Sequence, residues 1–478
     1  MTNSQNRQNV SLRKELSLLE LTVIGLVGAV GTGILFSAPQ MMVQSGPAVV
    51  LGWILGGIFY FFISLTYMEM GTLYPPEAGG PARYAYYTHG PPVTNLLNAW
   101  ASMVWYLFIP PAEAIAVVYG INYFTHNLLT PSGIPTWLGG AGVAAALILL
   151  MVPFNYFGVK AFGVSTTGIG IFKLILYLII PVGLMVAVFM PQNFTGLPGG
   201  FMPYGAAAMF ASIPLAMFAF GGTRVIPDYA EEMKNPQRDL PLAVLLVVIG
   251  QTLVYVLFAV AYVASLNWST FGVKPGDWAD LTMITSSYNP VMFIAGKYGL
   301  TYLLVIATIV GILGPFVVGY IYLGAGSRVL FSMYRSKYVG AKVGEIHERY
   351  AIPYWALIIF GLAGLVLALL SPIPTVYMII EEAVVAGYLG FSVVPVSLVV
   401  SRRQGGLSGG VYKVPAPAII GALAFIFATW IIYWSGWPAT PYGVLLVFIL
   451  STIFGAIYRV KAGLGTPFGM SFTCWRWS

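Results

Sequence analysis

The sequence has few charged residues and almost no side chains that bind metals. Of its 478 residues, 8% are charged and 58% are hydrophobic, whereas a soluble domain carries roughly 25% charged residues. The chain holds one cysteine, Cys474, and three histidines that lie far apart, at positions 89, 126 and 347. These features exclude a soluble enzyme, an internal disulfide and a thiolate metal site. We therefore expect a membrane protein that is not an enzyme and that holds no metal or cofactor.

Long apolar runs recur along the whole chain. A helix needs about 20 apolar residues to cross a bilayer, and the sequence contains twelve runs of that size. The pattern predicts an all-α integral membrane protein with twelve transmembrane helices in a single domain, residues 1–478. The predicted spans cover residues 17–44, 47–73, 96–124, 136–155, 164–190, 205–232, 239–266, 298–332, 351–371, 374–400, 415–436 and 440–459.

The positions of the basic residues test this topology, because lysine and arginine concentrate in cytoplasmic loops. With a cytoplasmic N-terminus, the lysines and arginines lie at inner helix ends or loops, except for Lys274 and Lys297 in an outer loop and Lys173 within a span. The charges thus predict a protein of the cytoplasmic membrane with both termini inside. Topology also explains the net charge of +7, so we expect the lipid bilayer, and not nucleic acid, as the partner of the basic residues.

Two of the predicted spans contain glycine clusters near their middle. The first span carries the run GTG at residues 31–33 and a proline at position 39, and the sixth carries GG at 221–222 and a proline at position 227. Unwound backbone inside a bilayer is tolerated only where protein or a water-filled cavity surrounds it. The clusters therefore predict two broken helices beside a binding cavity.

Matching breaks in two halves of a chain are typical of transporters built from inverted repeats. The repeat would comprise spans 1–5 and 6–10 within residues 16–403, and residues 404–478 would add two helices and a C-terminal tail. Half-helix N-termini attract a carboxylate and half-helix C-termini attract an ammonium group. The breaks thus favour a small zwitterionic substrate, although glycines such as Gly25 and Gly28 also permit simple close packing of helices.

Five motifs, in order along the chain, resemble those of the amino acid/polyamine/organocation permeases. They are GAVGTGILFSAP in the first span, YMEMGTLYPPEAGGPARYAY at the end of the second, DYAEEMKNPQRDLPLA after the sixth, GAGSRVLFSMYR at the end of the eighth and YKVPAP before the eleventh. The resemblance implies a five-plus-five inverted-repeat fold with two further helices. It also implies transport of amino acids by alternating access.

The resemblance further implies a substrate site at the two breaks. The substrate carboxylate is expected on the backbone amides of residues 32–34, and the amino group on carbonyl groups around residues 218, 219 and 221. Two phenylalanines of this set would close over the substrate, and core or lipid packing is their alternative role. The implied contact residues are Gly31, Thr32, Gly33, Ile34, Phe218, Ala219, Phe220 and Gly221.

The sequence after the second break departs from the family pattern. The run FGGTR stands where the family usually has a small residue, glycine, an aromatic residue and an acid, so Thr223 and Arg224 carry no expectation from the resemblance. Arg224 precedes Asp228 by one helical turn, and we expect a structural ion pair between them. The inner loop EEMKNPQRDLP is expected to be a solvated turn in which Asp239 caps the next helix, with a structural and gating role and not one in substrate binding.

Lys173 lies within the fifth predicted span, about 14 Å along the helix at 1.5 Å per residue. An ionisable group at this depth is a candidate for function. In many members of the family a lysine near this point resembles a substitute for a sodium ion between the first and eighth spans, which disfavours sodium coupling. Lys173 would act either as a fixed cation or as a proton carrier, or else its side chain reaches the inner headgroups.

Other acidic residues also lie in or near the predicted spans. Glu113 in the third span and the pair Glu381 and Glu382 in the tenth are expected to face a vestibule or a polar neighbour. Glu69 lies near an inner helix end, and we expect it to pair with Arg83 or with a basic group of a nearby loop.

Three functions are consistent with the sequence. The first is a secondary transporter that moves an amino acid by proton symport, exchange or facilitated diffusion. The second is a carrier of polyamines or other organic cations, for which Glu113 with Glu381 or Glu382 would supply the counter-charge. The third is a membrane enzyme or a nutrient receptor, and the lack of an acid-base constellation argues against the enzyme.

Overall fold

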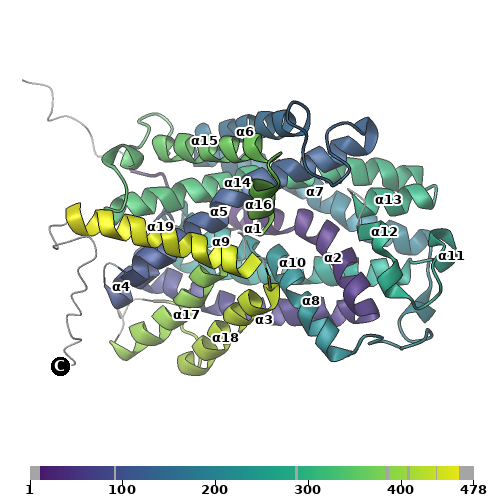
Figure 1. Ribbon diagram of the computed structural model, residues 1–478. Helices are drawn as coiled ribbons and strands as arrows, with labels where there is room; N and C mark the ends of the chain where they lie inside the picture. The colour runs from purple at the N-terminus through teal and green to yellow at the C-terminus, as the bar shows by residue number, and fades with distance from the viewer. Residues whose placement is uncertain are drawn as a thin grey trace, which may run out of the picture.

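The computed structural model describes residues 11–90, 93–285, 289–382, 387–405, 410–437 and 439–461. Within these residues the chain forms helices joined by turns and loops, and extended pairing is limited to two isolated bridges, Leu16 with Met233 and Leu129 with Pro135. The long helices run roughly along one axis of the molecule (Figure 1). The described part of the chain thus has the all-α architecture that the sequence predicts.

Long and medium-length helices form the body of the molecule. They are α1 (Leu18–Ala29), α2 (Thr32–Ser45), α3 (Val49–Leu73), α5 (Val93–Thr125), α6 (Gly140–Tyr156), α7 (Val159–Ala187), α8 (Gly205–Ala219), α9 (Gly222–Asp228), α10 (Pro236–Ala264), α14 (Thr301–Arg335), α15 (Tyr354–Leu370), α16 (Pro374–Glu382), α17 (Gly387–Arg403), α18 (Pro417–Ser435) and α19 (Ala439–Lys461). Within the described residues, eight helical stretches are long and apolar enough to cross a bilayer, and the shorter helices α1, α6 and α15 are also apolar.

These helices coincide with the predicted spans. The first predicted span is divided between α1 and α2, and the sixth between α8 and α9. The tenth contains α16 and most of α17, which lie on either side of residues 383–386, outside the described part of the chain. Each of the remaining predicted spans holds one helix whose ends differ from the prediction by a few residues. Glu381 and Glu382 end α16, but their side chains lie outside the described residues, so their predicted position beside a vestibule stays a prediction.

Small residues allow the helices to pack closely. Helix α5 lies along α14, where a Cβ atom added to Gly120 would be 3.2 Å from the carbonyl oxygen of Gly311. A Cβ atom added to Gly25 of α1 would be 2.7 Å from Val247 of α10. Tight approach at small residues is how transmembrane helices gain van der Waals contact, so close packing explains Gly25.

Short elements occupy the two ends of the helix bundle. One end carries α11 (Trp268–Phe271), η5 (Trp278–Asp280), α12 (Thr282–Thr285) and α13 (Pro290–Lys297), and the opposite end carries α4 (Tyr84–His89) (Figure 1). The first group lies in the connection between α10 and α14.

Near the end that carries α4, the N-terminal segment is tied to the 3-10 helix η4 (Ala230–Glu232). The backbone amides of Glu15 and Leu16 both donate to the carbonyl of Glu232 over 2.9 Å, and Lys234 returns a hydrogen bond to Leu16.

Candidate functional site

The first helix break lies between α1 and α2. Helix α1 ends at Ala29, and α2 begins at Thr32 with Gly31 as its N-cap. Gly31 provides no side-chain hydrogen bond to the cap, and the first amides of any helix have no partner within the helix itself. The N-terminus of α2 therefore presents backbone donors in the interior of the protein.

The second helix break lies between α8 and α9, at Phe220 and Gly221. Here the backbone hydrogen bonds shorten to the i to i+3 type, from the amide of Phe220 to Met217 and from that of Arg224 to Gly221, each over 3.1 Å. Because the regular i to i+4 hydrogen bonds stop here, carbonyl oxygens at the end of α8 are left without a partner within the helix. Two tyrosine hydroxyls already donate to this end: Tyr388 to Met217 over 2.5 Å and Tyr255 to Ala219 over 2.7 Å.

The two breaks lie directly against each other. A Cβ atom added to Gly33 would be 2.6 Å from the Cβ of Ala219, which is closer than two carbon atoms tolerate. The hydroxyl of Tyr255 lies 2.7 Å from the carbonyl oxygens of both Ala29 and Ala219. Tyr255 on α10 therefore holds the end of α1 beside the end of α8.

A small cavity lies between the breaks and helices α5 and α14. The uncapped end of α2 and the last turn of α8 both border it. Its lining residues are Gly28, Ala29, Gly33, Ile109, Glu113, Phe218, Ala219, Val318 and Tyr322. The cavity thus brings together backbone donors, backbone acceptors and one carboxyl group, which are groups that bind a small dipolar molecule.

The two phenylalanines of the predicted site have different positions. Phe218 lines the cavity. Phe220 is fully buried among the rings of Trp53, Tyr60 and Tyr255, with centroid distances of 5.9, 5.7 and 5.1 Å. Core packing, the alternative role considered for both residues, therefore describes Phe220 in this structure, and Phe218 is the one of the two that lines the cavity.

Two ionisable groups flank the first break. Glu113 on α5 accepts a hydrogen bond from the hydroxyl of Thr32 over 2.7 Å. Lys173 on α7 is fully buried, and its ammonium donates to the carbonyls of Val27 over 2.9 Å and Gly314 over 3.0 Å. These bonds link α1 to α14 through α7. The buried position of the ammonium excludes the alternative that Lys173 reaches the headgroups.

The expected ion pair between Arg224 and Asp228 is absent from the structure. The Nη2 group of Arg224 donates to the hydroxyl of Ser102 over 2.5 Å, and Asp228 accepts from the hydroxyl of Tyr106. The helical spacing is right, but both side chains turn to α5 and bind its polar groups. The prediction of an ion pair was wrong for that reason.

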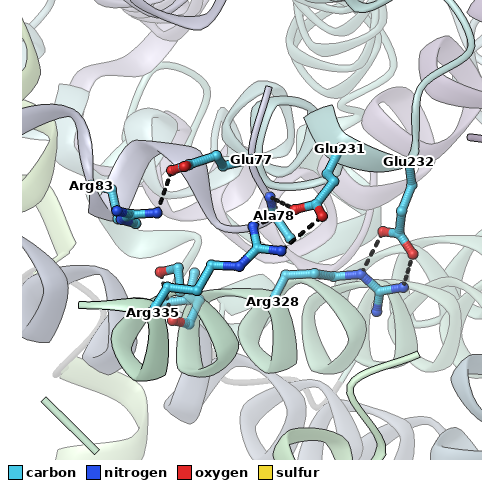
Figure 2. A network of polar contacts seen from close by, with 9 residues as sticks. Glu77, Ala78, Arg83, Glu231, Glu232, Arg328 and Arg335 are labelled. Carbon is cyan, nitrogen blue, oxygen red and sulfur yellow. Dashed lines mark hydrogen bonds and ion pairs between the residues drawn. The ribbon is translucent and has the colours of Figure 1, made fainter. Parts of the chain in front are cut away.

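Beyond these contacts, two adjacent glutamates of η4 bind two arginines of α14. Glu232 forms a bidentate pair with Arg328, with both oxygen–nitrogen distances at 2.8 Å, and Glu231 pairs with Arg335 (Figure 2). We call the contacts Arg224–Ser102, Tyr106–Asp228, Arg328–Glu232 and Arg335–Glu231 the α9 seam. The α9 seam joins α9 and η4 to α5 and α14.

The α9 seam corrects the prediction for the charged loop. The loop was expected to be a solvated turn, but Glu232 is fully buried and paired. Asp239 was expected to cap the next helix, whereas Asn235 is the N-cap residue of α10 and Asp239 lies within its first turn. Long-range pairing with arginines of α14 explains the burial, which local sequence does not reveal.

Glu69 also has a different partner from the one expected first. Its carboxylate binds Arg402 at the end of α17 and accepts a hydrogen bond from the backbone amide of Val414 over 2.6 Å. Arg83 instead pairs with Glu77 over 2.6 Å. Glu69 therefore has the structural role that its position near a helix end indicated, but with Arg402.

We predict that Glu232→Gln destabilises the protein strongly. It removes one charge from a buried pair and leaves the guanidinium of Arg328 uncompensated, which costs about 3–5 kcal/mol. The matched control is Glu231→Gln, because its partner Arg335 is 28% exposed and a pair of that kind contributes about 1 kcal/mol or less. Thermal unfolding in detergent measures both. Equal shifts of the two midpoints would contradict the prediction.

Comparison with known proteins identifies the family. A sequence model of the family described as Amino acid permease matches residues 20–465. The chain belongs to the amino acid permease family. The permease is 27% identical over 474 residues to the glutamate/serine transporter AimA of Bacillus subtilis (strain 168), an alignment that covers 98% of the permease and 85% of the relative.

Two further relatives come from the same organism. The permease is 28% identical over 458 residues to an aspartate-proton symporter, covering 94% of the permease and 85% of the relative. It is 24% identical over 442 residues to the branched-chain amino acid permease BcaP, covering 89% of each chain. The permease is thus an amino acid transmembrane transporter, a multi-pass membrane protein and not an enzyme, as the motifs predict.

Sequence reasoning missed several residues that shape this site. Tyr255, Tyr322 and Tyr388 lie within predicted spans, although Trp and Tyr are in general enriched at membrane interfaces. Their depth in a span was the available signal. Ile109 and Val318 also line the cavity, but nothing in the sequence separates them from other apolar residues of a span.

Proposed function

We propose that the permease is a secondary transporter that carries an amino acid across the cytoplasmic membrane by alternating access. The α-carboxylate of the substrate accepts hydrogen bonds from the backbone amides of residues 32–34. Its amino group donates to the carbonyl groups of Phe218, Ala219 and Gly221. The observation that supports this assignment is the cavity between the two helix breaks, because an uncapped helix N-terminus and a helix C-terminus attract groups of opposite charge.

The proposed architecture contains twelve spans. Spans 1–5 and 6–10 form an inverted repeat within residues 16–403, and residues 404–478 add two helices and a tail. Both termini lie in the cytoplasm. Support comes from the positions of the two breaks in the first and sixth predicted spans, since matching broken helices are a feature of transporters with inverted repeats. In this arrangement the α9 seam closes the path from the cavity to the cytoplasm.

We propose a proton as the coupling ion. Lys173 occupies the space between α1 and α14 with a covalently attached cation, so no sodium ion is required there. Glu113 binds Thr32 at the helix end where the substrate carboxylate would lie. Two carboxylates at one site repel each other, and a protonated Glu113 therefore favours substrate binding. The name of one relative, an aspartate-proton symporter, is consistent with this coupling.

The substrate side chain is not decided by the relatives. Their names refer to glutamate and serine, to aspartate and to branched-chain amino acids. A polyamine carrier is the second candidate, since Glu113 lines the cavity and would attract an organic cation. Glu381 and Glu382, the other groups suggested for that role, have side chains outside the described residues.

Uptake into proteoliposomes tests the proposed function. We predict that labelled amino acids accumulate when the lumen is more alkaline than the outside, that a protonophore abolishes the accumulation and that an inward sodium gradient does not drive it. Empty liposomes provide the background. Binding without flux would favour a receptor, and putrescine uptake that no amino acid inhibits would favour the polyamine carrier. Either result would overturn the proposal.

A further inference from the structure

Arg224 is a buried cation that lacks an anionic partner. Among the buried arginines of the described residues, Arg328 has a carboxylate partner and Arg224 has none within 4 Å. Its Nη2 group binds the hydroxyl of Ser102, whereas Nε and Nη1 have no hydrogen-bond partner. Asp228 attracts Arg224 only from beyond 4 Å, and a cation without an anion in direct contact is costly in a protein interior. Ionisable groups retained inside membrane segments commonly mark the path of a substrate.

The surroundings of Arg224 are mainly aromatic. The guanidinium carbon lies 5.9, 5.7 and 5.0 Å from the ring centroids of Tyr67, Tyr106 and Phe391. Rings at this distance stabilise a cation in part, but they accept no strong hydrogen bond from its N–H groups. A Cβ atom added to Gly390 of α17 would be 3.5 Å from Nη1. The nitrogen is buried without a hydrogen-bond partner, and the glycine places no side chain against it.

Arg224 lies between the cavity and the two ion pairs of the α9 seam, Arg328–Glu232 and Arg335–Glu231. Tyr322 lines the cavity, and the ring of Tyr106 packs against it with a centroid distance of 5.6 Å. The guanidinium of Arg224 in turn packs against the ring of Tyr106. Its partner Ser102 precedes Ile109, the cavity-lining residue nearest to it on α5, by about 10 Å at 1.5 Å per residue, a distance that a single acidic amino acid does not span. A substrate in the cavity therefore reaches Arg224 only after the Tyr106–Tyr322 layer opens.

We propose that Arg224 is an anion-binding subsite on the inner half of the transport path, and that it receives the side-chain carboxylate of an acidic amino acid. The inference rests on the proposed function of amino acid transport and names the substrate class. A guanidinium forms a planar fork that matches a carboxylate. Nη2 together with either Nε or Nη1 of Arg224 supplies such a fork once the α9 seam separates.

The charge of Arg224 selects among substrates. A side-chain carboxylate is strongly penalised when it leaves water without a partner, and a cation on the path offsets that penalty. A neutral side chain of the same shape gains less from the guanidinium, because its amide oxygen accepts a hydrogen bond but carries no negative charge. The permease should therefore transport glutamate and aspartate in preference to glutamine and asparagine, and most of this preference should depend on Arg224.

Uptake of the isosteric pair glutamate and glutamine tests the subsite in proteoliposomes. In the wild-type permease the uptake efficiency, kcat/KM, should be at least about tenfold higher for glutamate, and Arg224→Met should reduce the ratio by at least about tenfold, the loss expected for one charge-assisted hydrogen bond. Arg224→Lys keeps the charge and should retain part of the ratio. Arg238→Met is the matched control, because Arg238 is exposed at the start of α10, and it should leave the ratio unchanged.

The outcomes separate the subsite from a purely mechanical role. A residue that only holds the α9 seam closed would change the rates of both substrates together and leave their ratio unaltered, which would overturn the inference. Equal wild-type transport of glutamate and glutamine would also overturn it, and this comparison needs no variant to fold. Absence of any amino acid uptake would instead overturn the proposed function.

Discussion

Gly33→Val should abolish binding of the substrate while leaving the permease folded in the membrane. A Cβ atom at this position would lie 2.6 Å from the Cβ and 2.8 Å from the Cα of Ala219. Because the second contact is with backbone, the two breaks must move apart. The amides of residues 32–34 then lose their proposed position relative to the carbonyls of α8. Loss of two hydrogen bonds to a carboxylate, each about 1.5–3 kcal/mol, weakens binding by at least about 100-fold.

A matched variant separates this effect from a general effect of valine in a helix. Gly168→Val on α7 introduces the same side chain where no atom lies within 4 Å of the added Cβ, and it should bind normally. Binding of labelled amino acid to purified protein is the measurement, and size-exclusion chromatography with thermal unfolding establishes that each variant is folded. Retained affinity in Gly33→Val would discredit the site at the two breaks.

Local sequence signals predicted the helix breaks. Glycine pairs within an apolar run are visible without any knowledge of neighbours, and the structure ends α1 before Gly31 and α8 before Phe220. The helix bounds followed from apolar run length for the same reason. The depth of Lys173 could be counted from the start of its span, because an α-helix rises by a constant distance per residue.

Long-range partners could not be predicted in the same way. Glu69 and Arg402 are 333 residues apart in the sequence, and Tyr255 meets Ala29 across 226 residues. The sequence around one residue of such a pair does not specify the other residue. The error at Arg224 has a related cause: helical spacing favoured Asp228, but hydroxyl groups on α5 compete for both side chains. Patterns within one helix therefore reveal which residues can interact, and packing between helices decides which of them do.

Lys173→Ala should reduce accumulation driven by a proton gradient by at least about tenfold. The substitution removes both hydrogen bonds of the ammonium, to Val27 and Gly314, and so unlinks α1 from α14. Each hydrogen bond from a charged donor contributes about 1.5–3 kcal/mol, and a factor of ten corresponds to about 1.4 kcal/mol. Lys160→Ala is the control on the same helix, because Lys160 is exposed, and it should accumulate substrate normally.

Lys173→Arg distinguishes a proton carrier from a fixed cation. Arginine keeps the positive charge but does not release its proton in proteins. If Lys173 carries the proton, Lys173→Arg should still exchange labelled for unlabelled amino acid across the membrane but should lose accumulation under the proton gradient. A fixed cation would instead permit proton-driven accumulation in Lys173→Arg. Normal accumulation with unchanged ion dependence in Lys173→Ala would remove the residue from the mechanism altogether, whichever of the two roles is considered.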